Sequence, residues 1–472
     1  MRERASVLVA TRAAHPVHPV HVAPAARVAD AAFAYALDHA LSRVEPFAAR
    51  GRVTEVSGGV IKATGLACSL GELCTLHDRN HGAIGQAEVI GFAGNTTFLT
   101  PIGRVRSLSP HVDVVPCNAS FRIGVSNALI GRVLDGFGEP IDGGGPIATD
   151  PHCRDVKPVD VDADPPAALS RRLVDAPLAT GVRAIDGFLT CGVGQRIGIF
   201  APAGVGKSTL ICMIARGCDA DVNVIVLVGE RGREVREFIE NVLGVQGLAR
   251  SVVIAATSDR SPTERIKAAQ VGTAIAEYFR ARGQRVLLLV DSLTRLARAQ
   301  REIGLALGEP PTRRGFPPSV FALLPRLIER AGNDAHGSIT AFYSVLTEGA
   351  DDDDPIAEEV RALVDGHIVL TRALASANHF PAIDMLSSVS RVMRAVASRE
   401  HVIAASELRL LAARHDEMAI LIRAGEVRAG ADPLLDRACA VRPHLDQFLR
   451  QEVDAPTATL PVTVSQLQRL LA

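Results

Sequence analysis

The feature that most constrains this 472-residue chain is a glycine-containing loop between a predicted buried strand and a predicted helix. The strand covers residues 196–200 (RIGIF), and the loop reads APAGVGKS from Ala201 to Ser208. Successive backbone N–H groups of such a loop form an anion-binding nest, which the N-terminus of the following helix reinforces. This is the context that a P-loop requires, and it predicts binding of a nucleoside triphosphate.

The residue types in the loop match the parts of a triphosphate. Lys207 is expected to neutralise the β- and γ-phosphates, and Ser208 to contribute its hydroxyl to Mg²⁺. The general motif begins with glycine where this chain has Ala201, but Gly204 and Gly206 still permit close approach of phosphate to the backbone. The residues predicted to bind nucleotide here are Ala203, Gly204, Val205, Gly206, Lys207, Ser208 and Thr209.

Two acidic residues end further predicted strands. Asp291 follows residues 286–290, and a carboxylate at that position of a P-loop protein holds Mg²⁺; it is also suited to cap the helix that follows. Glu230 ends another strand and is a candidate to polarise the attacking water, with Arg231 and Glu234 fixing the surrounding network. The alternative for Glu230 is a surface loop of paired charges.

Strands and helices alternate from about residue 176 onward. Apolar runs at 222–229, 251–257, 286–291 and 338–346 are separated by helical segments, one of which begins with a capping box at Ser261 and Glu264. Continuous apolar strands that alternate with helices predict an α/β fold with a parallel sheet covered on both faces. Short glycine-punctuated strands from residue 51 predict a small β-barrel or sandwich. After about residue 395 the pattern is helical, except for a strand-like run TATLPVTV near residue 460.

Composition excludes several classes of protein. Lys plus Arg number 51 and Asp plus Glu 52, so the net charge of −1 gives no bulk attraction to nucleic acid. We find no run of the about 20 apolar residues that span a bilayer, and the chain is expected to be cytoplasmic. The eight cysteines are scattered singly, which is typical of reduced thiols. His15, His18 and His21 alternate with prolines in a segment that is expected to be a flexible tail rather than a metal site.

Several long motifs resemble the type III secretion ATPases, which are relatives of the catalytic β-subunit of rotary ATP synthases. The resemblance covers about residues 51–450. Ala201 also agrees with it, because the secretion branch commonly lacks the first glycine of the P-loop motif. The segments that carry it are GRVLDGFGEPIDGGGPI (131–147), GERGREVREFIE (229–240), DSLTRLARAQREIGLALGEPPTRRGFPPSVFALLPRLIERAG (291–332), GADDDDPIAEEVRALVDGHIVLTR (349–372) and PAIDMLSSVS (381–390).

The resemblance implies a RecA-like P-loop core with an N-terminal β-barrel and a C-terminal helical domain. The expected boundaries are an N-terminal extension at 1–50, the barrel at 51–118, the core at 119–394 and the helical domain at 395–472. It also implies a homohexamer that binds ATP and Mg²⁺ between subunits. Glu230 then becomes the catalytic carboxylate beside Arg231, and Arg391 an arginine finger that reaches into the neighbour's site. Phe380 would stack on adenine, with ordinary core packing as the alternative.

Three charged segments remain open to more than one interpretation. Asp351 to Asp354 form an acidic run that could bind a divalent ion. The resemblance instead implies a solvated loop at a subunit boundary, which we expect. Arg295, Arg298 and Arg301 recur at helical spacing and suit either a face toward a partner or pore, or a solvated face. The loop 310–315 is a candidate to approach the pore.

The predicted function is an ATPase that drives protein export, with the injectisome branch favoured over the flagellar one. A rotary ATPase subunit and an RNA translocase are the alternatives, but three Tyr and no Trp disfavour the stacking surface that RNA requires. One chain carries both Glu230 and Arg391, so a ring of identical subunits is expected to hydrolyse ATP unaided. The resemblance implies stalk and stator proteins, the export gate and chaperone–effector complexes as partners, with no specific nucleic acid and with peripheral membrane association through partners. Hydrolysis would then be coupled to chaperone release, unfolding and export.

Overall fold

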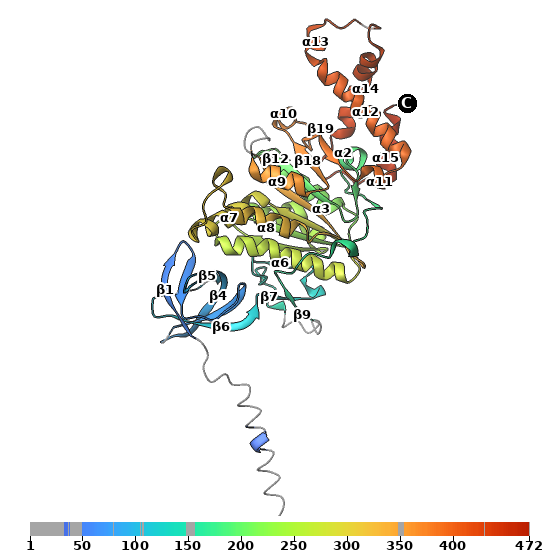
Figure 1. Cartoon of the computed structure of the whole chain (residues 1–472). Helices are drawn as coiled ribbons and strands as arrows, with labels where there is room; N and C mark the ends of the chain where they lie inside the picture. Colours follow the sequence, from blue (N-terminus) through green and yellow to red (C-terminus); the bar gives the residue numbers. More distant parts are fainter. Residues whose placement is uncertain are drawn as a thin grey trace, which may run out of the picture. The chain divides into compact units, whose positions relative to one another are not determined.

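The computed structural model describes residues 33–35, 37, 50–78, 80–103, 105, 108–147, 156–347, 354–428 and 430–471. The chain divides into two units, Met1–Ala49 and Arg50–Ala472 (Figure 1). In the first unit residues 33–35 and 37 are helical. The histidine–proline segment and Asp351 to Asp353 lie outside the described residues, and everything below concerns the second unit.

The second unit begins with a closed barrel. Its described strands are hydrogen-bonded in the order β1-β2-β5-β4-β3-β6, so the barrel, and not the sandwich, is the correct alternative. Side chains alternate between the two faces of a strand, and the inward set forms a separate core that includes Ile61, Leu76 and Leu99. The strands are β1 (Gly51–Ser57), β2 (Val60–Thr64), β3 (Glu72–Asp78), β4 (Gly82–Ala93), β5 (Thr96–Ile102) and β6 (Asp113–Ser120).

Short elements connect the barrel to the central sheet. β7 (Arg122–Val125) pairs with β9 (Lys157–Asp160), and β10 (Pro177–Leu178) pairs with β11 (Cys191–Gly192). The remaining elements of this segment are the 3₁₀ turns η1 (Asn127–Leu129) and η3 (Ala168–Ser170), the strand β8 (Val133–Leu134) and the helix α2 (Arg183–Phe188).

The central sheet has the order β19-β18-β12-β17-β15-β13-β14-β8 among the described residues, with β16 paired to β17. Strands β8, β14, β13, β15, β17, β12 and β18 are parallel, as the sequence predicts, whereas β19 is antiparallel to β18 and β16 to β17. The bounds are β12 (Arg196–Ala201), β13 (Val222–Val228), β14 (Ser251–Ala256), β15 (Arg285–Asp291), β16 (Gly332–Asn333), β17 (Ser338–Leu346), β18 (Gly366–Leu370) and β19 (Ile383–Ser390).

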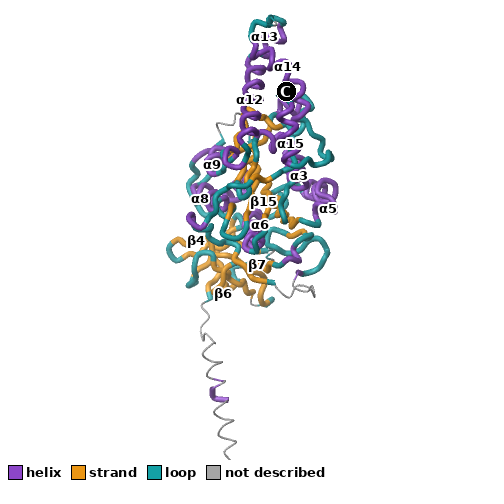
Figure 2. Tube along the Cα trace, turned by 90° about the vertical axis from the view of Figure 1, so that its right-hand side faces the viewer, coloured by secondary structure: helices purple, strands orange, loops and turns teal. Residues whose placement is uncertain are grey.

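Helices cover both faces of this sheet, which is why its central strands are mostly apolar. In β13, Val224 and Val226 pack on one face while Ile225 and Leu227 pack on the other. Figure 2 shows β15 between α8 and α9 on one side and α3 and α5 on the other. The helices of the core are α3 (Lys207–Gly217), α4 (Gly232–Glu237), the π-helical turn η4 (Phe238–Leu243), α5 (Gly244–Leu248), α6 (Pro262–Ala281), α7 (Leu293–Ala306), η5 (Arg313–Gly315), α8 (Pro318–Ile328), α9 (Pro355–Leu363), α10 (Arg372–Ser376) and α11 (Met393–Val396).

The described C-terminal part is helical, with α12 (Arg399–Glu417), α13 (Ala419–Ala424), α14 (Pro433–Leu449) and α15 (Leu460–Arg469). The strand-like expectation for TATLPVTV is wrong, because α15 begins at Leu460 within that run. Pro461 occupies the first turn, where its missing N–H costs no hydrogen bond, and Leu467 and Thr463 are buried. Tertiary packing therefore overrides the β-branched composition of a short run.

Candidate nucleotide site

The loop after β12 has the backbone that an anion-binding nest needs. Gly204 and Gly206 have φ angles of +81° and +88°, in the left-handed region that glycine adopts without strain. Gly206 is followed directly by α3, whose first residue is Lys207. Ala203, Gly204 and Ser208 are exposed, and a Cβ at Gly204 would meet nothing within 4 Å, so the outer side of the loop is open.

Lys207 is only 8% exposed and lies between two carboxylates. Its Nζ contacts Asp291 Oδ1 and lies 3.9 Å from Glu230 Oε1. The topology explains this meeting, because β12, β13 and β15 run parallel and their carboxyl ends share one edge of the sheet. The three residues that sequence spacing predicted for phosphate, metal and water chemistry are therefore brought together.

Glu230 and Asp291 each have a second partner. Arg295 Nη1 lies 2.7 Å from Glu230 Oε2, and Ser344 Oγ donates to Asp291 Oδ1 over 2.6 Å. Burial and then the nearby charge of Asp291 raise the pKa of Glu230, which the charge of Lys207 and the hydrogen bond from Arg295 oppose. A carboxylate with a raised pKa beside a P-loop lysine is typical of a group that exchanges protons during a reaction.

Arg231 and Phe380 flank this cluster. Arg231 is exposed, and its Nη1 lies 3.6 Å from Glu234 Oε1 in the turn that begins α4. Phe380 is 39% exposed, so it is not an ordinary core residue. A Cβ placed on Gly206 would lie 3.5 Å from the Phe380 ring, so the ring stands beside the P-loop.

Arg391 lies at the opposite edge of the sheet. β18 is parallel to β12, and β19 is antiparallel to β18, with Ser390 opposite Gly366 at the beginning of β18. The end of β19 therefore lies beside the beginning of β12, while the P-loop follows the end of β12. At about 3.3 Å per residue, the length of this strand separates Arg391 from the P-loop of the same chain by roughly 17–20 Å.

Sequence reasoning missed two members of the cluster, Arg295 and Ser344. Arg295 stands one helical turn after Asp291, a spacing that was a usable signal, but its side chain packs inward on Glu230 rather than only toward a partner, a pore or solvent. Ser344 is one of several buried polar residues in β17, and no sequence pattern marks it.

Other charged residues also have structural partners. The guanidinium of Arg301 lies 5.2 Å from the centre of the Phe316 ring, so this arginine is not simply solvated. Asp354, the described member of the acidic run, caps α9 by accepting from the backbone N–H groups of Ile356 and Ala357. In the loop 310–315, Arg313 lies 3.5 Å from Glu358.

Comparison with known proteins shows the family of the chain. Residues 181–390 match the ATP synthase alpha/beta family, nucleotide-binding domain, and residues 397–469 match the T3SS EscN ATPase C-terminal domain. The type 3 secretion system ATPase of Xanthomonas euvesicatoria is 55% identical over 408 residues, which cover 86% of this chain and 91% of that protein. The chain belongs to the type 3 secretion ATPase family. It is an ATPase, and its fold is the RecA-like P-loop core with N-terminal strands and a helical C-terminal region.

Other relatives of this secretion ATPase include flagellar proteins and solved structures. The flagellum-specific ATP synthase of Bacillus subtilis is 48% identical, over 89% of this chain and 94% of that protein. The assembled ATPase EscN of enteropathogenic E. coli has a TM-score of 0.83 at 44% identity, covering 89% of this chain and 100% of that one. EscN with its central stalk EscO gives a TM-score of 0.80. Across the described part of this chain, none of the helices has the length and apolar character to span a bilayer.

Proposed function

We propose that this secretion ATPase is the motor of an injectisome, and that it works as a ring of identical copies in which Arg391 completes the ATP site of a neighbour. The observation that carries the proposal is the position of Arg391. An arginine side chain is too short to cross the sheet from the far edge to the P-loop of its own chain, whereas a neighbouring copy offers its P-loop without that restriction.

In the proposed site, the backbone from Ala203 to Thr209 binds the phosphates and Lys207 neutralises the β- and γ-phosphoryl oxygens. Glu230 orients the attacking water and accepts its proton, while Arg295 keeps the Glu230 carboxylate in place. Arg231 holds the turn that carries Glu230 through Glu234, and Phe380 stacks on adenine beside the loop. Arg391 of the neighbour neutralises charge on the γ-phosphoryl group as the bond to the leaving oxygen breaks.

A divalent ion fits the residues at this edge. Asp291 supplies a carboxylate with a hydrogen bond from Ser344, and the exposed Ser208 supplies a hydroxyl, which are the oxygen ligands that Mg²⁺ prefers. Bound there, Mg²⁺ would neutralise charge on the phosphates. The Asp291 carboxylate contacts Lys207 in this structure, and it is the carboxylate that would hold the ion together with the Ser208 hydroxyl.

The proposed partners follow from the relatives. EscN is described as assembled and in complex with a central stalk, which supports a hexamer of this chain around a stalk protein. We include a stator protein, the export gate and chaperone–effector complexes as further partners, with the ring at the inner face of the cytoplasmic membrane and hydrolysis coupled to chaperone release, unfolding and export. The 55% identity to a secretion relative, against 48% for a flagellar one, supports the injectisome branch.

The test of the shared site is the ATPase rate of the purified full chain against protein concentration. A specific activity that rises steeply with concentration is expected, because assembly brings Arg391 to the neighbour. Arg391→Ala should lower kcat by about 10³–10⁵-fold while ATP still binds. The exposed Arg437, which pairs with Glu407 at 2.7 Å, provides the control Arg437→Ala with near-normal activity. Full activity of the Arg391→Ala chain at saturating protein would refute the shared site.

A further inference from the structure

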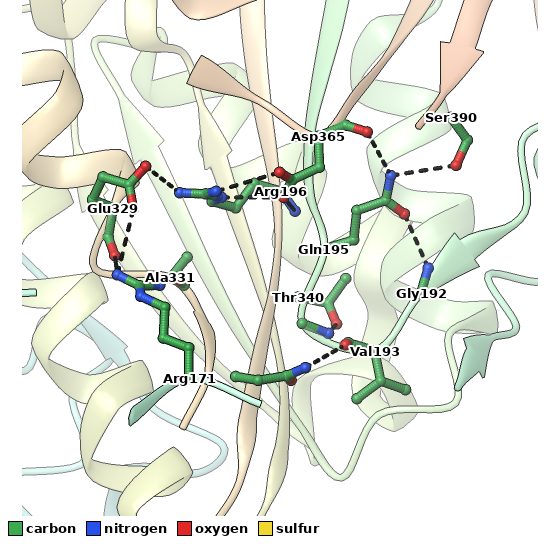
Figure 3. A network of polar contacts seen from close by, with 12 residues as sticks. Arg171, Gly192, Val193, Gln195, Arg196, Glu329, Ala331, Thr340, Asp365 and Ser390 are labelled. Atoms are coloured by element: carbon green, nitrogen blue, oxygen red, sulfur yellow. Dashed lines mark hydrogen bonds and ion pairs between the residues drawn. The ribbon is translucent and has the colours of Figure 1, made fainter. Parts of the chain in front are cut away.

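A network of polar contacts surrounds the beginning of β12, at the edge of the sheet that carries Arg391 (Figure 3). Arg196, the first residue of β12, forms a paired contact with Asp365, with its Nε 3.1 Å from Oδ2 and its Nη2 3.3 Å from Oδ1. Its Nη1 lies 2.5 Å from Glu329 Oε1. Arg171 donates to the backbone oxygens of Glu329 and Ala331 and so extends the network into the connecting segment.

Asp365 is the residue through which this network reaches the arginine finger. The backbone N–H of Arg391 donates to the Asp365 carbonyl oxygen over 3.0 Å. The same carbonyl oxygen accepts from Gln195 Nε2 over 3.2 Å, and that amide also donates to Ser390 Oγ over 3.3 Å. Gln195 is fully buried, and its Oε1 accepts from the backbone N–H of Gly192, so its amide has a single orientation.

The Asp365 side chain fixes the residue that presents this oxygen. Asp365 Oδ2 accepts from the backbone N–H of Arg196 over 3.0 Å, and the backbone N–H of Asp365 donates to the Arg196 carbonyl oxygen over 2.8 Å. Residue 365 is therefore held by both backbone and side chain to the first residue of the strand that leads into the P-loop. A charge-assisted, paired contact of this kind restricts geometry more than a single neutral hydrogen bond does.

The same local structure occurs once more in the described chain, without any contact to Arg391. At the beginning of β15, Asp221 Oδ2 accepts from the backbone N–H of Arg285 over 2.7 Å, and the Asp221 N–H donates to the Arg285 carbonyl over 2.8 Å. Arg285 Nη2 lies 3.3 Å from Asp221 Oδ1. This pair provides a control with the same backbone pattern, because it ties an aspartate to the first arginine of a neighbouring strand; Arg285 differs in that it also pairs with Asp219 over 3.1 Å.

We propose that Asp365, held by Arg196 and Gln195, is a positioning residue that sets the direction in which Arg391 points toward the neighbouring subunit. The inference rests on the proposed function, since it assumes that Arg391 acts on the neighbour's ATP. Asp365 touches neither nucleotide nor reacting atoms. Its effect passes through the backbone N–H of Arg391, which the Asp365 carbonyl oxygen holds, and through the Ser390 hydroxyl, which the Gln195 amide holds.

The first test measures hydrolysis and nucleotide binding of the full chain separately. Asp365→Ala is expected to lower kcat by about 10–100-fold, the loss that a displacement of about 1 Å causes, with the Kd for ATP within about twofold. Asp365→Asn keeps an oxygen for the Arg196 N–H and should retain more activity. Asp221→Ala should lower thermal stability, by less because that pair is more exposed, and should keep its kcat. An equal fall in kcat for Asp221→Ala and Asp365→Ala would overturn the proposal.

The second test uses mixed rings, in which the second kind of chain supplies an unaltered Arg391 to the ATP site of the Asp365→Ala chain. Chains carrying Glu230→Gln keep Arg391 but lack the carboxylate, so mixing them with Arg391→Ala chains should restore hydrolysis. Mixing Glu230→Gln with Asp365→Ala chains should restore it too, because the intact finger comes from the neighbour. Mixing Asp365→Ala with Arg391→Ala chains should restore nothing, because both lack a working finger.

The outcomes separate the two proposals. Suppose that Glu230→Gln chains restore hydrolysis when mixed with Arg391→Ala chains but not when mixed with Asp365→Ala chains. The defect of Asp365→Ala would then lie in that chain's own ATP site, and the positioning role would be overturned. Absence of restoration with Arg391→Ala would overturn the shared site and the positioning role together. Gln195→Leu, which removes the amide but keeps the size of the side chain, provides an independent variant that should follow Asp365→Ala in every mixture.

Discussion

The chain buries two lysines against carboxylates, one at the P-loop and one where the barrel meets the core. Lys207, 8% exposed, contacts Asp291 and lies 3.9 Å from Glu230, so two carboxylates share it. Lys267, 5% exposed, has Glu88 alone at 2.8 Å and lies 5.4 Å from the centre of the Phe121 ring. At the P-loop one lysine faces two carboxylates, so the charges there do not balance in pairs. At the junction one lysine faces one carboxylate, and the two charges balance.

Their surroundings differ in the same sense. The loop before Lys207 is open on its outer side, and the backbone N–H groups there have room for an anion. Beside Lys267, Thr100 of the barrel contacts Thr263 of α6, so a further bond joins the two parts next to the ion pair, although Lys267 and Glu88 also line an open pocket there. A buried lysine with a single carboxylate partner is typical of a structural ion pair. A lysine that two carboxylates share at an open edge of a sheet is typical of a binding or catalytic site.

The largest expected effect is on activity. Lys207→Met should lower kcat by at least about 10³-fold, because the γ-phosphoryl charge and two carboxylates lose their shared cation. Phosphate release by the full chain measures it, and thermal unfolding checks that the fold persists. Lys267→Met serves as the control, and its kcat should be near normal at temperatures where that chain is folded. If the kcat of the Lys207→Met chain stayed within tenfold of the parent value, the distinction between the two lysines would be lost.

The next effect is on stability, and it should be confined to the second pair. Lys267→Met should cost about 3–5 kcal/mol of unfolding free energy, because Glu88 is left charged and buried without a partner. Adding Glu88→Gln should recover most of this loss, since no buried charge then remains. The half-exposed pair of Lys62 with Glu55 at 2.9 Å offers the control Lys62→Met, with a loss under about 1 kcal/mol in denaturant titration. Equal losses for Lys62→Met and Lys267→Met would mean that burial does not matter at the junction.

The smallest expected effect is a change in pH dependence. Arg295 favours the charged form of Glu230, so Arg295→Ala should raise the pKa of Glu230 further above its ordinary value. Because the proposed base must be ionised, the acid limb of the kcat/KM profile should move to higher pH, with a loss at neutral pH smaller than the about 10²–10⁴-fold that removing the base costs. Arg295→Lys should move the limb less. A profile that keeps its acid limb in Arg295→Ala would contradict the role of Glu230 as base.

Local spacing predicted the P-loop, the two strand-end carboxylates and the alternation of strands and helices, because each depends on residues within one turn or one strand. It did not predict that Arg295 packs on Glu230 or that Ser344 bonds Asp291, since those contacts join elements far apart in sequence. The prediction of a strand near residue 460 was wrong for the same reason. Burial of Leu467 against the core stabilises the helix there, and a window of eight residues does not contain that information.

The sequence by itself determined which chemistry is available: a lysine and serine after a glycine loop, carboxylates at strand ends and an arginine after the last strand. Only the tertiary structure decided where each group acts. Parallel pairing of β12, β13 and β15 gathers Lys207, Glu230 and Asp291 at one edge, and the reversal between β18 and β19 carries Arg391 to the other. Strand direction has this effect because a parallel neighbour ends at the same edge of a sheet and an antiparallel one at the opposite edge.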